Sequence, residues 1–330
     1  VTGFAERHGI PVVSDWRAGD RIRTDSPVAV GELGYSRTED TVRVLTEADL
    51  LLVVGTTLSD IPTDGFTLRQ QHSARNWVVN VDAGLRQHSG AVTRHILASP
   101  VAFGSAVAGM ELGEHPDWTD WLEPAANAHR EHMRIPSSAG NNAPGTADME
   151  LVVKALLPHL PEDTAVTTGS GNHTAWAQRY VPKGGYPCHF SVRNGTMGYS
   201  VPSAVAVSLA QPERFVLSVS GDGEFLMNSQ ELATAVQYGA RPLIVVVDNG
   251  QYGTIRAHQE RHYPGRVSGT QLRNPDFAAV ARGYGAHGAR LERNEDIEGV
   301  IADAVRAVTE DRVPAVVHVV ADPAKLLPGM

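Results

Sequence analysis

Residues 218–253 read SVSGDGEFLMNSQELATAVQYGARPLIVVVDNGQYG, with one apolar run before GDG and a second before DNG. The runs at 215–219 and 243–247 each predict a buried strand, with GDG as the turn that leaves the first, and ELATAVQY between them predicts a helix. Gly239 suits the end of that helix, and Pro242 prevents its continuation. The stretch therefore has the length and pattern of one βαβ unit of about 30 residues.

Two polar side chains follow the two strands of this unit. Asp222 lies within GDG and Asn249 within DNG, with 24 residues between Gly223 and Asp248. Because the carboxyl ends of neighbouring parallel strands lie about 4.8 Å apart at the ligand-binding edge of the sheet, we expect both side chains to converge on one cation. A carboxylate, an amide oxygen and a backbone carbonyl suit Mg²⁺ or Ca²⁺, and Mg²⁺ commonly completes its shell with phosphate oxygens.

The surroundings of Asp222 suit a phosphate. Its flanking glycines let backbone N–H groups approach closely, and the helix that follows offers its positive N-terminal end.

Asn228 and Glu231, three residues apart, predict a capping box at the start of the helix over ELATAVQY. The alternative is that GDG and DNG are only turns, since Asp-Gly and Asn-Gly are common turn dipeptides. Their separation by one βαβ unit disfavours this alternative.

Short apolar runs recur along the whole chain. They lie at 50–54, 78–81, 215–219, 243–247 and 315–320. They are rich in Val, Leu and Ile and show little alternation, which is typical of strands buried on both faces of a parallel sheet. Helix-like stretches separate them, so the chain is predicted to be α/β, with two parallel-sheet domains.

The composition changes in the middle of the chain. HPDWTDWLEPAANAHREHMR indicates a helix, and IPSSAGNNAPGTAD is a connector rich in Pro, Gly, Ser and Asn. We therefore expect a first domain, a linker and a second domain at residues 1–115, 116–147 and 148–330. FAERHGIPVVSDW near the start predicts the end of a helix, a stop at Gly9 and a buried strand after Pro11, so the first domain opens partway into an α/β unit.

Charge and cysteine content narrow the class of protein. The 330 residues contain 28 Lys plus Arg against 37 Asp plus Glu, a net charge of −9, which makes nucleic acid an unfavourable partner. Cys188 is the single cysteine, so neither an intramolecular disulfide nor a cysteine metal cluster is expected, and a reducing, cytoplasmic setting fits. No apolar run approaches the ~18 residues of a membrane span.

The GDG-to-Asn spacing resembles the thiamine diphosphate binding motif, and GDGEFLMNSQELATAVQYG is similar to that stretch of the acetolactate synthase-like family. GTMGYSVPSAVAVSLAQPERFVLSV resembles the family segment before it, and DNGQYGTIRAHQERHYPGRVSGTQLRNPDFAAVARGYGAHG resembles its continuation. LLLVVGTTLSDIPTDGFTL resembles the family's central domain. The resemblance covers residues 1–325 and is strongest over 164–290. It implies a C-terminal domain with a thiamine diphosphate-binding fold.

The resemblance assigns a metal site and part of a phosphate site. It implies that Asp222 and Asn249 are side-chain ligands of Mg²⁺ and that the carbonyl of Gln251 is the third protein ligand. It also implies that Gly223 and Glu224 offer backbone groups to the diphosphate. The implied cofactor-binding set further includes Gly221, Tyr252 and Gly253.

Two further segments enter through the resemblance. In TTGSGNHTAW, it implies that Asn172 and His173 touch the diphosphate, although His173 alone suggests only the start of a helix. In NGTMGYS, it implies that Met197 is the wedge beneath the bent cofactor, framed by backbone contacts of Thr196 and Gly198. A lone Met is more often core filler.

Members of the family have three domains, and the N-terminal pyrimidine-binding domain is expected to be absent here. The catalytic Glu of the family lies in that domain, so no catalytic residue is assigned, and Glu224 and Glu231 are not substitutes. The chain is then a fragment, which Val1 in place of Met favours, or one half of a split enzyme. Either way we expect a homo- or hetero-oligomer in which a pyrimidine-binding domain completes the cofactor site.

The resemblance implies an enzyme that decarboxylates a small 2-oxo acid such as pyruvate, or joins its product to a second carbonyl compound. Tyr252, Ile255, His258 and Gln259 have spacings that suit one side of a helix after the metal turn, where they would line the substrate site. The alternative is that this helix only packs against the fold and is solvated. One alternative is a non-catalytic subunit that keeps the diphosphate half. Another, a dinucleotide-dependent oxidoreductase, is disfavoured because the sequence has no G-x-G-x-x-G turn with an acidic residue ~20 positions on.

FAD binding is left open. Some acetolactate synthases hold FAD with a basic residue soon after a strand glycine of the central domain, where this chain has Thr56 and Thr57. Arg37 and Arg69 are the remaining candidates for a nucleotide, although scattered surface arginines seldom have this role.

Overall fold

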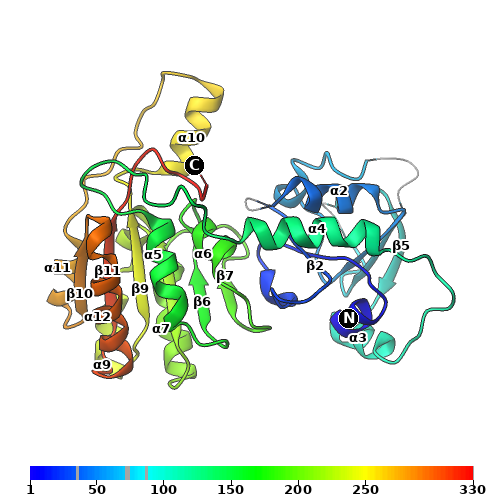
Figure 1. Ribbon diagram of the computed structural model, residues 1–330, viewed down its shortest axis with the longest axis horizontal. Helices are drawn as coiled ribbons and strands as arrows, with labels where there is room; N and C mark the ends of the chain where they lie inside the picture. The colour runs from blue at the N-terminus through cyan, green and yellow to red at the C-terminus, as the bar shows by residue number, and fades with distance from the viewer. Residues whose placement is uncertain (35–36, 71–74, 86–87, 330) are drawn as a thin grey trace. The chain divides into compact units, whose positions relative to one another are not determined.

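The computed structural model describes residues 1–34, 37–70, 75–85 and 88–329 and divides into two compact units, Val1–Met133 and Arg134–Met330 (Figure 1). Every strand pair within the named sheets is parallel, with helices between the strands. The predicted α/β class and the two parallel-sheet units are therefore confirmed. The predicted domain ranges 1–115, 116–147 and 148–330 stay a prediction.

The first unit holds a two-stranded sheet, β1-β2, and a three-stranded sheet in the order β3-β4-β5. Its strands are β1 (Val12–Ser14), β2 (Ala29–Glu32), β3 (Leu50–Val54), β4 (Arg75–Asn80) and β5 (Val92–Leu97). Its helices are α1 (Thr2–Arg7), α2 (Glu39–Glu47), α3 (Pro100–Val107) and α4 (Thr119–His132), with 3-10 turns at Gly19–Arg21 and Ile61–Thr63. The predicted helix end, stop at Gly9 (φ 63°) and following strand are confirmed.

One expected element of the first unit is present, and another differs from its prediction. The predicted helix in the 116–147 segment is α4, which packs Leu122 and Ala125 against Val30 and so forms part of the core of this unit. The prediction that the strand at 50–54 is buried on both faces is wrong. It is an edge strand that buries Val53 but leaves Leu50 and Leu52 36% and 38% exposed.

The second unit is built on a six-stranded sheet in the order β10-β11-β9-β8-β6-β7. Its strands are β6 (Ala165–Thr168), β7 (His189–Ser191), β8 (Val216–Gly221), β9 (Leu243–Asp248), β10 (His287–Leu291) and β11 (Ala315–Val320). Its helices are α5 (Met149–Leu156), α6 (Thr174–Tyr180), α7 (Ser200–Ala210), α8 (Asp222–Asn228), α9 (Glu231–Tyr238), α10 (Gly253–His262), α11 (Phe277–Gly283) and α12 (Ile297–Thr309), with 3-10 turns at Leu157–His159 and Asn294–Asp296.

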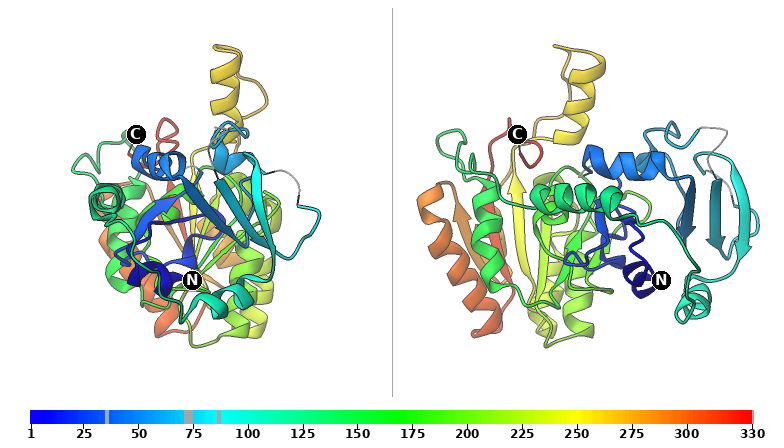
Figure 2. Two further views of the ribbon diagram at one scale, coloured as in Figure 1. Left: turned by 90° about the vertical axis from the view of Figure 1, so that its right-hand side faces the viewer. Right: turned by 45° about the vertical axis from the view of Figure 1, so that its right-hand side comes forward.

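Helices cover both faces of this sheet. Alternate residues of the central strands, such as Val245 and Val317, pack against α5, α6 and α12, while Ile244 and Val316 pack against α7, α8, α9 and α11. Helix α10, yellow in Figures 1 and 2, stands away from the sheet. Among the described residues, no helix is both long and apolar enough to cross a lipid bilayer.

The βαβ unit predicted from 218–253 is present, with one change. β8 leads directly into α8 at Asp222, so GDG starts a helix rather than forming a separate turn, and α9 follows as a second helix. The predicted capping box is wrong, because Asn228 is the last residue of α8 and its side-chain amide donates to the carbonyl of Gly198 at 2.7 Å. Gly239 ends α9 in the left-handed conformation (φ 73°), as predicted.

Candidate functional site

Asp222 joins the ends of the two strands that the sequence singled out. It is the first residue of α8 and is 4% exposed, and β8 and β9 are neighbours in the sheet. Its Oδ1 accepts the N–H of Gly223 at 2.8 Å, and its Oδ2 accepts the N–H of Gly250, in the turn after β9, at 3.0 Å. The GDG and DNG segments therefore meet at the carboxyl edge of the sheet, as expected.

Asn274 is a neighbour of this carboxylate that the sequence reasoning missed. Its side-chain amide donates both to Oδ2 of Asp222, at 2.8 Å, and to Oδ1 of Asp248, at 2.7 Å. It lies in the loop before α11, 52 residues from Asp222. No spacing or motif in LRNPDF marks it, because only the fold brings it to the strand ends.

A buried histidine supports the second carboxylate from the adjacent strand. His318, on β11, is fully buried, and its Nε2 lies 2.7 Å from Oδ2 of Asp248. Its Nδ1 accepts the N–H of Phe277 at 3.2 Å, so Nε2 carries the proton that is donated to Asp248. The polar His within the apolar run AVVHVV was a sequence signal for this contact, although a weak one.

The pKa values of the two carboxylates are shifted in opposite directions. Burial, reinforced by the charge of Asp248, raises the pKa of Asp222 from its ordinary value of 3.8 to about 6. Burial also acts on Asp248, but hydrogen bonds from His318 and Asn274 outweigh it and lower the pKa of Asp248 below its ordinary value. A cation beside Asp222 would offset the cost of its buried negative charge.

The turn after β9 presents the other expected metal ligands. Oδ1 of Asn249 accepts the N–H of Gln251 at 3.2 Å, and Gln251 is 4% exposed. The side-chain amide of Gln251 donates to the carbonyl of Pro323 at 2.8 Å. Gln251 also lies opposite Gln271 in an isolated antiparallel bridge. The two hydrogen bonds of this bridge run from the N–H of Tyr252 to the carbonyl of Thr270 and from the N–H of Leu272 to the carbonyl of Gly250, so they do not use the carbonyl of Gln251.

The donor set fits a hard cation. Asp222, Asn249 and the Gln251 carbonyl are oxygen donors of the kind that Mg²⁺ or Ca²⁺ prefers. Within the described part of the chain, no group of three or more His, Cys, Asp and Glu residues is arranged to hold a metal. A zinc-type site of nitrogen and sulfur donors therefore has no support among those residues.

Three glycines make the close packing of this edge possible. A Cβ on Gly223 would lie 2.5 Å from Cε1 of Tyr252, and one on Gly221 would lie 2.7 Å from Nδ1 of His173. Gly253 is similarly close to Asn249, whose Nδ2 would lie 3.1 Å from an added Cβ. Glycine at 221 and 223 thus lets the side chains of His173 and Tyr252 pack directly against the GDG backbone.

The TGSGNH segment lies against the same edge. His173 is 8% exposed, and its Nε2 lies 2.7 Å from Oε2 of Glu224, although without the alignment of a hydrogen bond. The side chain of Asn172 accepts the hydroxyl of Thr254, in α10, at 2.8 Å. Both residues expected at the diphosphate are therefore held beside the GDG and DNG segments.

The predicted wedge lies in the loop before α7. Met197 is half-buried, Thr196 is exposed, and Gly198 adopts the left-handed conformation (φ 81°). The carbonyl of Gly198 accepts the amide of Asn228, and a Cβ on Gly198 would lie 2.6 Å from that amide nitrogen. The end of α8 thus fixes this loop.

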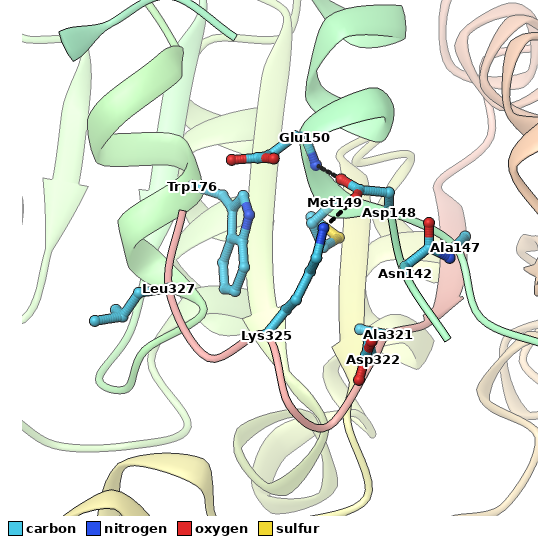
Figure 3. A pocket seen from close by; sticks show the side chains of 10 residues that line it. All are labelled: Asn142, Ala147, Asp148, Met149, Glu150, Trp176, Ala321, Asp322, Lys325 and Leu327. Carbon is cyan, nitrogen blue, oxygen red and sulfur yellow. Dashed lines mark hydrogen bonds and ion pairs between the residues drawn. The ribbon is translucent and has the colours of Figure 1, made fainter. Parts of the chain in front are cut away.

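A separate small pocket lies beside the C-terminal segment (Figure 3). Lys325 points across it toward Asp148, and the Nζ–Oδ2 distance is 2.7 Å. Glu150 and Trp176 also line it, whereas none of the predicted cofactor-binding residues does. The pocket therefore belongs to the anchoring of the C-terminal segment on α5 rather than to the candidate site.

The two arginines considered for a nucleotide both have other partners. Arg69 is 1% exposed and donates to Oδ1 of Asn76 and to the carbonyl of Leu45, both at 3.0 Å. Its interpretation as a surface arginine is therefore wrong, because it satisfies buried acceptors of the first unit. Arg37 pairs with Asp64, with Nη2 2.5 Å from Oδ2.

Two family models match the chain. The model of the central domain of thiamine pyrophosphate enzymes matches residues 1–96, and the model of their C-terminal TPP binding domain matches residues 169–319. The chain belongs to the thiamine pyrophosphate enzyme family. Thiamine pyrophosphate is thiamine diphosphate, so the recognised resemblance is confirmed, and every residue of the candidate site lies within the C-terminal match.

The curated relatives of this family member include acetolactate synthases. The chain is 30% identical over 323 residues to an acetolactate synthase large subunit of Parasynechococcus marenigrum, with 96% of this chain and 51% of that protein covered. It is 30% identical over 285 residues to the acetolactate synthase isozyme 2 large subunit of Escherichia coli, with 85% and 50% covered. A sulfoacetaldehyde acetyltransferase of Castellaniella defragrans is 26% identical over 346 residues, with 96% and 56% covered. The chain spans about half the length of these relatives.

Proposed function

We propose that the second unit binds Mg²⁺ and thiamine diphosphate for an enzyme that acts on a small 2-oxo acid. The observation that carries the proposal is the meeting of the GDG and DNG segments at Asp222, which accepts hydrogen bonds from both. The buried carboxylate with a raised pKa and the oxygen-only donor set support a divalent cation at this point.

The residues divide by the part of the cofactor that each would hold. Asp222, Asn249 and the Gln251 carbonyl hold Mg²⁺, with Tyr252 and Gly253 completing their loop. The diphosphate is held by Asn172, His173 and the backbone of Gly221, Gly223 and Glu224, and the pyrimidine is framed by Thr196, Met197 and Gly198. When bound, thiamine diphosphate supplies the electron sink that the decarboxylation of a 2-oxo acid requires. The chain contributes orientation and compensation of the diphosphate charge.

The substrate proposal is pyruvate or a near analogue, decarboxylated or joined to a second carbonyl compound. The names of two relatives as acetolactate synthases support it, and the third, a sulfoacetaldehyde acetyltransferase, shows that related chains serve other substrates. The mixed polar and apolar residues of α10, including Ile255, His258 and Gln259, suit a small polar substrate. CO₂ release by the complete enzyme from a panel of 2-oxo acids tests this, and turnover of bulky aryl substrates alone would contradict it.

We also propose that a pyrimidine-binding domain, in the same polypeptide or another, completes the site in an oligomer. The coverage of only half of each relative supports this proposal. It includes the alternative that the chain serves as the diphosphate-binding subunit of a split enzyme. Mixing the chain with a candidate partner and measuring activity separates the two arrangements.

Calorimetry tests the cofactor proposal directly. Thiamine diphosphate is titrated into the chain with and without Mg²⁺, and then into the Asp222→Ala variant. Binding that needs Mg²⁺ and is lost in the variant is expected, while Asp303→Ala, an exposed change on α12, serves as the control that keeps the affinity. Equal affinity in the absence of Mg²⁺, or in Asp222→Ala, would refute the proposal.

A further inference from the structure

The side chain of Glu224 lies where three segments of the candidate site meet. It is 1% exposed, and its Oε1 accepts the backbone N–H groups of Tyr199, at 3.1 Å, and of Ser200, at 3.2 Å. Its Oε2 lies 2.7 Å from Nε2 of His173. One carboxylate thus contacts the loop that carries Met197 and the loop that carries the expected diphosphate ligands.

Glycines vacate the space that this arrangement needs. A Cβ on Gly169 would lie 1.5 Å from Oε1 of Glu224 and 2.2 Å from its Cδ. A Cβ on Gly221 would lie 2.7 Å from Nδ1 of His173. The carboxylate and the imidazole therefore each occupy a place that only glycine backbone leaves open, which fixes both side chains.

The polar groups around Glu224 explain how its carboxylate can be buried beside His173. A buried carboxylate without partners is strongly unfavourable, and here two backbone amides donate to Oε1 while the His173 ring lies beside Oε2. Because Nε2 of His173 faces Glu224, Nδ1 is the ring nitrogen left for a ligand, and it lies beside the backbone of Gly171 and Gly221. Glu224 therefore determines which edge of His173 is available.

We propose that Glu224 is a positioning residue that couples the two ends of the thiamine diphosphate site. One oxygen orients His173 for the diphosphate, and the other holds the amides of Tyr199 and Ser200, and with them the Thr196–Gly198 loop at the pyrimidine. The inference rests on the proposed function, because it assigns a side-chain role within that site. The role proposed here belongs to the side-chain carboxylate of Glu224, whereas the family resemblance implies only that the backbone of Glu224 contacts the diphosphate.

The first test compares two ligands in the Glu224→Met variant. Met fills a similar volume but offers no acceptor, so the contacts to both loops are lost. Affinity for inorganic diphosphate with Mg²⁺, which reports only the His173 end, should fall by about tenfold, because the polar contact that orients His173 is lost. Affinity for thiamine diphosphate with Mg²⁺ should fall by a larger factor, because the pyrimidine loop is also released.

Three further variants make the test specific. His173→Ala should lower the affinity for both ligands by the same factor, and adding Glu224→Met to it should weaken inorganic diphosphate binding no further. Glu224→Gln keeps an acceptor for the amides and a polar group beside the ring, so it should restore most of the affinity. Gly169→Ala displaces the carboxylate without removing it, so it should reproduce the Glu224→Met pattern, and it serves if that variant does not fold.

Glu150→Met is the matched control. Glu150 is 4% exposed and accepts the hydroxyl of Tyr180 and the N–H of Gly329, both at 2.8 Å, so its replacement destabilises the fold without touching either cofactor loop. Its affinities should equal those of the unsubstituted chain. Unchanged affinities in Glu224→Met, or multiplicative effects of Glu224→Met and His173→Ala on inorganic diphosphate, would overturn this inference alone. Failure of the unsubstituted chain to bind either ligand would overturn the proposed function.

Discussion

The raised pKa of Asp222 predicts that its negative charge destabilises the metal-free protein. Folding moves this pKa from 3.8 to about 6, so between these pH values the native state binds the proton more strongly than the unfolded state. The free energy of unfolding therefore falls as the pH rises through this window, and the loss is complete above pH 6. At 1.36 kcal/mol for each pH unit, the loss amounts to about 3 kcal/mol.

The Asp222→Asn variant removes this ionisation with little change of shape. Urea unfolding of both proteins, without metal, gives their difference in stability at pH 4 and at pH 8. The variant should gain about 2.5 kcal/mol over the unsubstituted chain between the two pH values, because part of the loss has already occurred at pH 4 and any pH-independent packing cost cancels. Adding Mg²⁺ with thiamine diphosphate should reverse the order at pH 8, since only the unsubstituted chain binds them.

The outcome that refutes this reasoning is equally specific. If the stability difference between the two proteins is the same at pH 4 and pH 8, Asp222 does not titrate in the raised range. If, without metal, the free energy of unfolding of the unsubstituted chain rises relative to that of the variant as the pH rises, the pKa of Asp222 is lowered rather than raised. Its neighbours then stabilise the negative charge, and no cation is needed to do so.

Three other substitutions test contacts outside the metal ligands. Arg69→Met should destabilise the first unit by about 2 kcal/mol, because the acceptor of Asn76 is left buried, and should leave thiamine diphosphate affinity unchanged in calorimetry. Lys325→Met, which leaves the 1%-exposed Asp148 carboxylate without its ion pair, should lower the melting temperature, and an unchanged value would show the pair to be unimportant. His318→Leu should cost about 2 kcal/mol or more in urea unfolding, since Asp248 loses a buried donor.

Much of the candidate site follows from local sequence. The strands at 215–219 and 243–247, the stop at Gly239 and the meeting of Asp222 with the DNG turn all follow from apolar periodicity and the geometry of a βαβ unit. The capping box at Asn228 failed because the chain forms two helices, α8 and α9, where the pattern suggested one.

The remaining contacts depend on the tertiary structure. Asn274 and His318 are 52 and 70 residues from the carboxylates that they contact, and no local pattern encodes which loop or strand will face Asp222 and Asp248. The pairing of Glu224 with His173 depends on the space above Gly169, which a sequence does not display. Arg69 was misjudged for the same reason, since its buried acceptors come from other segments of the first unit.

The central claim is that one divalent cation sits between the GDG and DNG segments. A crystal structure of the chain grown with Mn²⁺ and thiamine diphosphate locates that cation by its anomalous scattering. The account predicts a single strong peak about 2.0–2.3 Å from the side-chain oxygens of Asp222 and Asn249 and from the carbonyl oxygen of Gln251. A peak elsewhere with these three oxygens unoccupied, or bound thiamine diphosphate without a metal peak, would contradict it.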